Sequence, residues 1–211
     1  MIRFTIFGIP VQVDIWFWIT MAVIGGAFTA RTSLAVLLVL VFMFAGFLSI
    51  LVHELGHALM IRRYNLPTSI TLQAFGGYAT YPNGATTRKQ DFLITLMGPV
   101  AQIGLGLILL LIKGRVSIPE GSLFDPFLNF LILVSIAWAI LNCLPVYPLD
   151  GGRLLTAVLG PKRESTVYLI GAIVGFGIVA IAILWMQAPL LALLVGLMAW
   201  QNLQMYQNAS S

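Results

Sequence analysis

Residues 34–62 read LAVLLVLVFMFAGFLSILVHELGHALMIR, and this stretch decides what kind of protein the chain is. It opens with 19 residues, Leu34 to Val52, that carry no charge. A helix needs about 20 apolar residues to cross the hydrocarbon core of a bilayer. Directly after this run come a histidine, a glutamate and a second histidine. The stretch therefore predicts a membrane-spanning helix that ends in ionisable side chains.

The composition of the whole chain agrees with a membrane protein. Of its 211 residues, 60% are hydrophobic and 9% are charged, whereas soluble domains carry about 25% charged residues. This composition excludes a soluble enzyme and a disordered tail, and the single cysteine, Cys143, excludes a disulfide-stapled module. The net charge of +4 comes from scattered basic residues, so nucleic acid is not an expected partner.

Further apolar segments predict an all-α polytopic membrane protein with about six transmembrane helices. The core spans are predicted at 34–62, 92–112 and 126–144, and the peripheral spans at 15–30, 167–186 and 190–203. A small β-element is expected beside them, because residues 1–13 alternate like a strand and residues 68–81 resemble a hairpin. No long linker divides the chain, so residues 1–211 are predicted to form one membrane-embedded domain.

Basic residues at the span ends predict how the chain crosses the membrane, because cytoplasmic loops are enriched in lysine and arginine. Most of them fall on the side that holds both termini and the loop between the second and third spans. The larger group is Arg3, Arg62, Arg63, Arg88, Lys89, Arg153, Lys162 and Arg163, and the smaller group is Arg31, Lys113 and Arg115. We therefore expect a multi-pass protein of the cell membrane with both termini in the cytoplasm.

Both histidines of the chain lie within His53-Glu54-Leu55-Gly56-His57. Positions i and i+4 share one face of a helix, so both imidazoles can reach a single metal ion. Zinc held by two histidines and a third ligand keeps one position open for water, whose pKa falls towards neutrality. Glu54 stands beside this pair and can act as general base without binding the metal. Ionisable residues at this depth cost about 2.5–3.5 kcal/mol each on insertion scales, which favours a zinc site over chance.

A carboxylate is the candidate for the third ligand, because the chain has no third histidine. Most carboxylates fall at predicted helix starts or in loops, where capping or solvation is the expected role: Asp14, Asp91, Asp125, Glu120 and Glu164. Asp150 differs, because two prolines precede it, two glycines follow it and it lies on the same side as the histidines. This pattern fits a ligand on an irregular segment, with a simple turn leaving the bilayer as the alternative.

Together these motifs resemble the site-2 protease family of intramembrane zinc metalloproteases. The resemblance rests on His53-Glu54-x-Gly56-His57 at the end of the second span. It rests equally on Asn142-x-x-Pro145-x-x-Pro148-Leu149-Asp150-Gly151-Gly152-Arg153 after the fourth span. Gly98-Pro99 in the third span and Gly76-Gly77 in the hairpin extend it. The order and spacing match over nearly the whole chain, and they indicate a compact form without a PDZ or CBS domain.

The resemblance implies a zinc-dependent endopeptidase that cuts transmembrane substrate helices, the reaction of regulated intramembrane proteolysis. It implies one Zn²⁺ per chain, bound by His53, His57 and Asp150, and a catalytic Glu54 that activates water. The expected partners are a transmembrane protein substrate and the lipid bilayer, and the active site is expected towards the cytoplasmic side.

Further roles follow only from the resemblance. Asn142 is implied to lie near the site, where its amide would hold the substrate or stabilise the oxyanion. The hairpin at Gly76 and Gly77 would pair with an unwound substrate by strand addition. The chain departs from the family pattern at Met97, Gln102 and Tyr147. Gln102 replaces the family's usual asparagine with a longer amide, so no catalytic role is expected for it.

Other functions are compatible with the same ligands. A different membrane metalloprotease acting on exposed cytoplasmic segments would normally take its third ligand from a downstream helical carboxylate. A membrane metal transporter or sensor would bind the ion without hydrolysis, but it needs polar residues along several spans. Outside the site the chain offers mainly Gln102 and Ser135. An inactive scaffold would not require Glu54.

Overall fold

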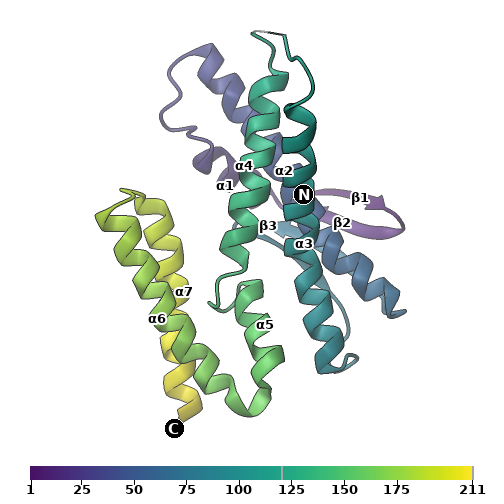
Figure 1. Ribbon diagram of the computed structural model, residues 1–211, viewed down its shortest axis with the longest axis vertical. Helices are drawn as coiled ribbons and strands as arrows, with labels where there is room; N and C mark the ends of the chain where they lie inside the picture. Colours follow the sequence, from purple (N-terminus) through teal and green to yellow (C-terminus); the bar gives the residue numbers. More distant parts are fainter. Residues whose placement is uncertain (120, 211) are drawn as a thin grey trace. The chain divides into compact units, whose positions relative to one another are not determined.

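The computed structural model describes residues 1–119 and 121–210, so Glu120 and Ser211 lie outside the described residues (Figure 1). In chain order the elements are β1 (Ile2–Ile6), β2 (Ile9–Val13), α1 (Ile15–Ile24), α2 (Ser33–Arg63), β3 (Ser69–Gln73), β4 (Gly76–Thr80), α3 (Arg88–Lys113), α4 (Phe124–Asn142), α5 (Asp150–Leu159), η1 (Pro161–Arg163), α6 (Glu164–Leu184) and α7 (Pro189–Ser210). Contacts divide the chain into a first unit, Met1–Ala85 with Met97–Ala139, and a second unit, Thr86–Leu96 with Ile140–Ser211. The single domain over residues 1–211 stays a prediction.

Helices long and apolar enough to span a membrane are present, as the sequence predicts. Within the described residues there are four: Ser33–Arg63, Arg88–Lys113, Phe124–Asn142 and Pro161–Leu184. They match the predicted spans at 34–62, 92–112, 126–144 and 167–186. The count of six stays a prediction, because the other two segments differ from expectation. The segment at 15–30 is helical only over Ile15–Ile24, and α7 extends beyond residue 203 into a polar end.

The short α1 begins beside the middle of α2. Its N-cap is Asp14, whose side chain accepts the N–H of Trp16 at 3.0 Å. Phe17 packs edge-on against Phe47, and a Cβ on Gly25 would lie 2.8 Å from Phe42 Cδ1. The two helices therefore run antiparallel, and α1 lies beside the first half of α2 only. Its ten residues rise about 15 Å, half of a bilayer core.

A four-stranded sheet in the order β1-β2-β3-β4 forms the small β-element. β1 pairs antiparallel with β2, β2 parallel with β3, and β3 antiparallel with β4. The hairpin predicted at 68–81 is present as β3 and β4. The N-terminal segment, predicted as one strand, is itself a hairpin, because Phe7 and Gly8 take positive φ values of 50° and 76° and form a two-residue turn.

The sheet packs on the second half of α2 and buries it. Strand side chains and helix side chains join in one apolar cluster, whose members include Ile9, Val11, Val13, Ile70 and Leu72 from the sheet and Ile50, Leu51 and Ala58 from α2. The sheet thus covers the turns of α2 that carry the histidines. On the face of α2 that meets the sheet, apolar side chains are therefore buried against protein.

In the second unit, α4 ends at Asn142, an irregular segment follows, and α5 begins at Asp150. The sequence predicts irregular backbone as far as Arg153, so its last four residues are a correction. The helix starts early because its first turn packs directly under the preceding loop. A Cβ on Gly151 would lie 2.2 Å from the carbonyl oxygens of Cys143 and Leu144. Glycine permits this approach of two backbones.

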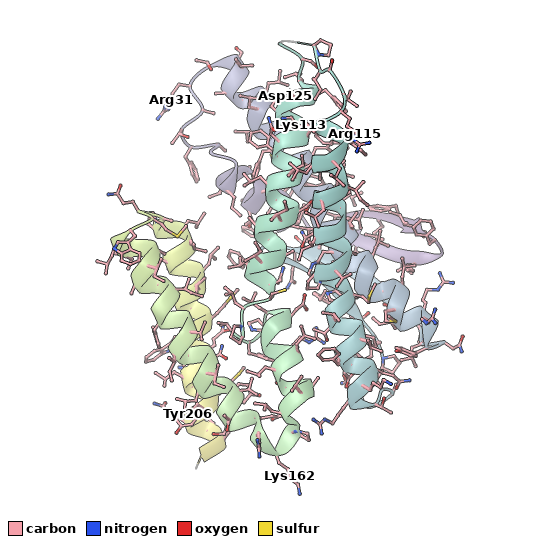
Figure 2. All side chains as sticks on the ribbon, viewed as in Figure 1. Arg31, Lys113, Arg115, Asp125, Lys162 and Tyr206 are labelled. Carbon is pink, nitrogen blue, oxygen red and sulfur yellow. The ribbon has the colours of Figure 1, made fainter. Side chains whose placement is uncertain are left out.

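Charged side chains gather at one end of the first unit. Arg31, Lys113, Arg115 and Asp125 all lie towards the upper end of that unit in Figure 2, with Arg31 apart from the other three. Lys113 Nζ is 2.8 Å from Asp125 Oδ1. The three basic residues are those that the sequence assigns to one side of the membrane, so their grouping agrees with that assignment. Which side is cytoplasmic stays a prediction.

Candidate metal centre

His53 and His57 come together on the last turns of α2. Their Nε2 atoms are 3.1 Å apart, and the two rings meet edge to face with centroids 4.8 Å apart. Their exposed fractions are 3% and 6%. The i, i+4 spacing therefore does what the sequence predicts, because both nitrogens point to the same place inside the protein.

Two glycines allow α3 to pack closely against this part of α2. A Cβ on Gly56 would lie 2.3 Å from the Met97 carbonyl oxygen, and a Cβ on Gly98 would lie 2.2 Å from His57 Nε2. The missing side chain of Gly98 leaves room at the one atom of His57 that faces His53. These glycines thus shape a space in which an ion can reach both imidazoles.

Glu54 lies against the sheet. It is 3% exposed, and a Cβ on Gly77 would lie 2.7 Å from its Cγ atom. Gly77 belongs to β4, the last strand in the sheet order. The structure therefore brings together the predicted general base and the strand predicted to pair with substrate. Gly76, the other predicted residue, is buried at the start of the same strand.

A chain of buried polar side chains leads to His53 Nδ1, the ring nitrogen that does not face His57. His53 Nδ1 lies 2.9 Å from Gln102 Oε1, and Gln102 Nε2 donates to Ser49 Oγ at 2.9 Å. The Ser49 hydroxyl lies 2.9 Å from the Ser135 hydroxyl. The sequence predicts no catalytic role for Gln102. A fully buried amide four residues after Gly98 in an apolar span was the available signal.

Asp150 is the first residue of α5 in the second unit and is 6% exposed. The loop before it is held by Asn202 of α7, which accepts the N–H of Tyr147 at 3.2 Å and donates to its carbonyl at 2.5 Å. Asn142 is the half-buried last residue of α4, and its role stays a prediction.

The donor chemistry fits zinc. His53, His57 and Asp150 offer two imidazoles and one carboxylate, all three buried. Zinc sites with a catalytic function typically combine three such ligands with one open position. The residues present therefore fit the metal that the sequence predicts.

Other carboxylates lie at helix starts, and the predicted capping role is confirmed for Asp14. Asp14 caps α1, Asp91 accepts a hydrogen bond from Thr86 Oγ1, and Asp125 pairs with Lys113. These interactions account for three of the alternative ligands. Asp150 therefore remains the candidate for the third metal ligand.

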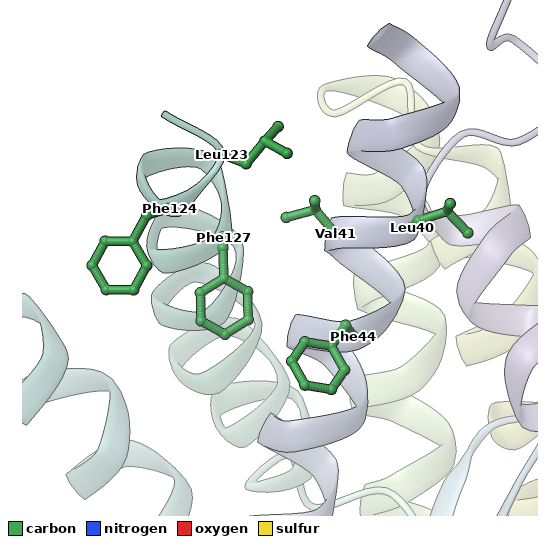
Figure 3. A pocket seen from close by; sticks show the side chains of 6 residues that line it. All are labelled: Leu40, Val41, Phe44, Leu123, Phe124 and Phe127. Atoms are coloured by element: carbon green, nitrogen blue, oxygen red, sulfur yellow. The ribbon is translucent and has the colours of Figure 1, made fainter. Parts of the chain in front are cut away.

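A cavity elsewhere in the first unit is unrelated to this centre (Figure 3). It has a volume of about 420 Å³ and is lined by Leu40, Val41, Phe44, Leu123, Phe124 and Phe127. These side chains are all apolar, and they offer no donor to a metal or a peptide. Phe44 also precedes His53 by nine residues, about 14 Å along the helix axis.

Comparison with known proteins identifies relatives of the chain. The model of the family described as "Peptidase family M50" matches residues 40–117 and 112–186. A zinc metalloprotease of Methanocaldococcus jannaschii is 31% identical over 162 residues, 75% of this chain and 45% of that protein. A putative zinc metalloprotease of Synechocystis is 31% identical over 142 residues, 65% of this chain and 37% of that protein. The chain thus spans less than half the length of these curated relatives.

A solved structure agrees with these relatives. The site-2 protease from Methanocaldococcus jannaschii superposes with a TM-score of 0.69 at 26% sequence identity, covering 97% of this chain and 94% of that chain. With two imidazoles converging beside a buried glutamate on a membrane-spanning helix, the chain belongs to peptidase family M50, the site-2 protease family.

Proposed function

We propose that the protein is a zinc-dependent intramembrane endopeptidase that hydrolyses peptide bonds in transmembrane substrate helices. The observation that carries the proposal is the convergence of His53 Nε2 and His57 Nε2, 3.1 Å apart, next to the buried Glu54. All three lie on α2, a helix long and apolar enough to span a membrane. The expected surroundings are the lipid bilayer, with the site towards the cytoplasmic side.

His53, His57 and Asp150 would hold one Zn²⁺ per chain. When bound, zinc supplies Lewis-acid chemistry, polarising the carbonyl of the scissile bond and lowering the pKa of the attacking water. The two histidines would bind the ion through Nε2, because these are the atoms that face each other. Asp150 would contribute a negative charge that offsets part of the charge of the ion.

Glu54 would carry the proton. Its carboxylate accepts a proton from water as the water oxygen adds to the carbonyl carbon of the substrate. It then returns this proton to the amide nitrogen as the carbon–nitrogen bond breaks, so the products are a carboxylic acid and an amine. A general base at this position contributes about 10²–10⁴-fold to the rate.

The substrate would enter as a strand. Peptide carbonyls of a transmembrane helix are already hydrogen-bonded, so the helix must unwind before cleavage, which favours substrates with glycine or proline near the cut. A strand added beyond β4, at Gly76 and Gly77, would regain its backbone hydrogen bonds from the sheet. Support comes from the closeness of Gly77 to Glu54, since it puts the end of the sheet beside the base. Asn142 would orient the substrate or stabilise its oxyanion.

Cleavage of a transmembrane test substrate by the purified chain in detergent tests the proposal. The substrate carries glycine and proline near its middle, and zinc is counted in each preparation. We expect Glu54→Gln to lose about 10²–10⁴-fold in rate while keeping one zinc. A zinc chelator should stop cleavage in the wild type, and added zinc should restore it.

Glu164→Gln is the matched control, because it removes the same charge at the start of α6. It should cut like the wild type. Equal cleavage by Glu54→Gln and wild type would refute the proposal. Bound zinc without cleavage of several substrates would favour a transporter or sensor, and zinc flux into liposomes would then be measured.

A further inference from the structure

We infer that Gln102 is a positioning residue that holds His53 in the tautomer presenting its Nε2 lone pair to the metal. It does so as part of a buried hydrogen-bond chain that runs from Ser135 on α4 through Ser49 on α2 to Gln102 on α3. The inference rests on the proposed metal site. It adds to that site a residue that binds neither the metal nor the substrate.

The direction of the chain follows from its donors and acceptors. The Gln102 amide nitrogen donates to Ser49 Oγ, so the Ser49 hydroxyl accepts from that side. Ser49 Oγ also hydrogen-bonds with Ser135 Oγ, 2.9 Å away. With its nitrogen turned to Ser49, the amide presents its oxygen to His53 Nδ1 at 2.9 Å. A carbonyl oxygen only accepts, so Nδ1 carries the proton and donates.

A neutral imidazole has one ring proton. When this proton sits on Nδ1, Nε2 keeps its lone pair, and Nε2 is the atom that faces His57. Hydrogen bonds of this kind to the far nitrogen of a metal-binding histidine fix both tautomer and ring orientation. The ring of His53 is thus set for metal before any metal arrives.

The side chains of this hydrogen-bond chain are buried, so each of them depends on its protein partners. Ser49, Gln102 and Ser135 are each 0% exposed. Water cannot replace a lost partner there, and a buried polar group left without one costs about 1–3 kcal/mol. The three helices therefore meet in an orientation that satisfies the amide, and the amide in turn orients His53.

Zinc affinity measured by competition with a chelator, in the full-length chain in detergent, tests the inference. Gln102→Leu keeps the bulk but removes the acceptor, and we expect zinc affinity to fall about 10–100-fold. Gln102→Glu keeps an acceptor for Nδ1, and the Ser49 hydroxyl can turn to donate to the carboxylate. We expect this variant to keep its zinc affinity within a few-fold and to preserve the visible spectrum of the Co²⁺-substituted protein.

Thr95→Val is the matched control, because Thr95 is a buried polar residue two turns earlier on α3. It should bind zinc like the wild type. Ser49→Ala, a smaller change in the same chain, should weaken zinc binding less than Gln102→Leu does, and it serves if Gln102→Leu fails to fold. Wild-type zinc affinity and an unchanged Co²⁺ spectrum in Gln102→Leu would overturn the inference. Equal weakening by Gln102→Leu and Gln102→Glu would overturn it as well.

The outcome is separable from that of the proposed function. If Gln102→Leu binds zinc normally while Glu54→Gln is inactive, only the inference fails. If the wild type binds zinc and cuts nothing, the protease proposal fails. The Gln102 variants can still be compared by their zinc affinity and by the spectrum of the Co²⁺-substituted protein. A wild-type chain that binds no zinc overturns both.

Discussion

The two halves of α2 differ in how far protein surrounds them. Of the buried residues of α2, only Val39, Ala45 and Gly46 precede Ser49, and the rest lie between Ser49 and Ile61. The first half presents side chains such as Leu40 and Phe44 outward. The second half is covered by the sheet and by α3. Polar chemistry inside a bilayer thus requires a helix to be surrounded by protein, and α2 meets this condition over half its length.

The same contrast appears in how glycines pack. A Cβ on Gly46 would meet the sulfur of Met21, the far end of a flexible side chain, at 2.9 Å. A Cβ on Gly56 would meet the backbone of Met97 at 2.3 Å. At Gly46, in the first half of α2, the neighbouring side chain can move aside. At Gly56, in the second half, the neighbour is backbone and cannot. The predictions below test this difference, in order of decreasing effect.

Gly98→Ala should have the largest effect, because the new Cβ would lie 2.2 Å from His57 Nε2 and push the ring away from the metal. Misplacement of a functional group by about 1 Å can cost about 10²-fold in rate. Zinc content and cleavage should both fall. Gly104→Ala is the control on the same helix, since its Cβ would have nothing within 4 Å. Normal zinc binding by Gly98→Ala would contradict the close packing of α3 on the centre.

Gly77→Ala should reduce cleavage but not zinc binding. Its Cβ would lie 2.7 Å from Glu54 Cγ, so the base must shift while the imidazoles stay in place. We expect a loss of about tenfold to a hundredfold, which is less than full removal of a general base would cost, because Glu54 is displaced and not deleted. Measuring turnover and bound zinc on the same sample separates an effect on catalysis from an effect on metal binding. A fall in zinc content equal to the fall in turnover would show that β4 supports the whole site rather than Glu54.

Gly56→Ala should lower stability, and Gly46→Ala should do so far less. Overpacking against backbone costs about 1–3 kcal/mol, whereas a methionine side chain can move aside. Thermal unfolding midpoints in detergent compare the two variants, which make the same change on the same helix. Equal midpoints would mean that the two halves of α2 are equally adaptable.

Leu40→Ala should have the smallest effect. Leu40 is exposed and lines the apolar cavity, away from the metal centre. Substitutions of this kind usually change stability by less than about 0.5 kcal/mol, so cleavage should stay within about twofold of wild type. A large loss of cleavage here would mean that the first half of α2 takes part in substrate handling.

Much of this fold could be predicted from the sequence where a single strong pattern governs an element. The uncharged run at Leu34–Val52 predicts α2, and the His-Glu-x-x-His spacing predicts that His53 and His57 converge. Both predictions depend on local geometry alone. The identity of Asp150 as third ligand came from its neighbours in sequence, and it remains to be tested by metal binding.

Other features depend on partners distant in sequence, and these were harder to predict. The apolar segment at 15–30 looks like a full span, yet α1 stops at Ile24, because it starts beside the middle of α2. The helix beginning at Asp150 was not predicted, because two prolines and two glycines flank that residue in the sequence. The structure shows that the glycines allow the helix to touch the preceding loop. Gln102 stands out in the sequence as an amide in an apolar span, but its contacts with Ser49 and His53 depend on how the helices pack.

The parallel pairing of β2 with β3 has a consequence for the order of events during synthesis. Val11 pairs with Ile70, so one strand must wait for the other while residues 14–68 are made. At about 5–20 residues per second the delay up to residue 73 is about 3–12 s. By then every residue of α2 has been synthesised. The strand that covers Glu54, β4, is therefore synthesised only after the whole of α2, so the sheet cannot bury this carboxylate until the helix that carries it is complete.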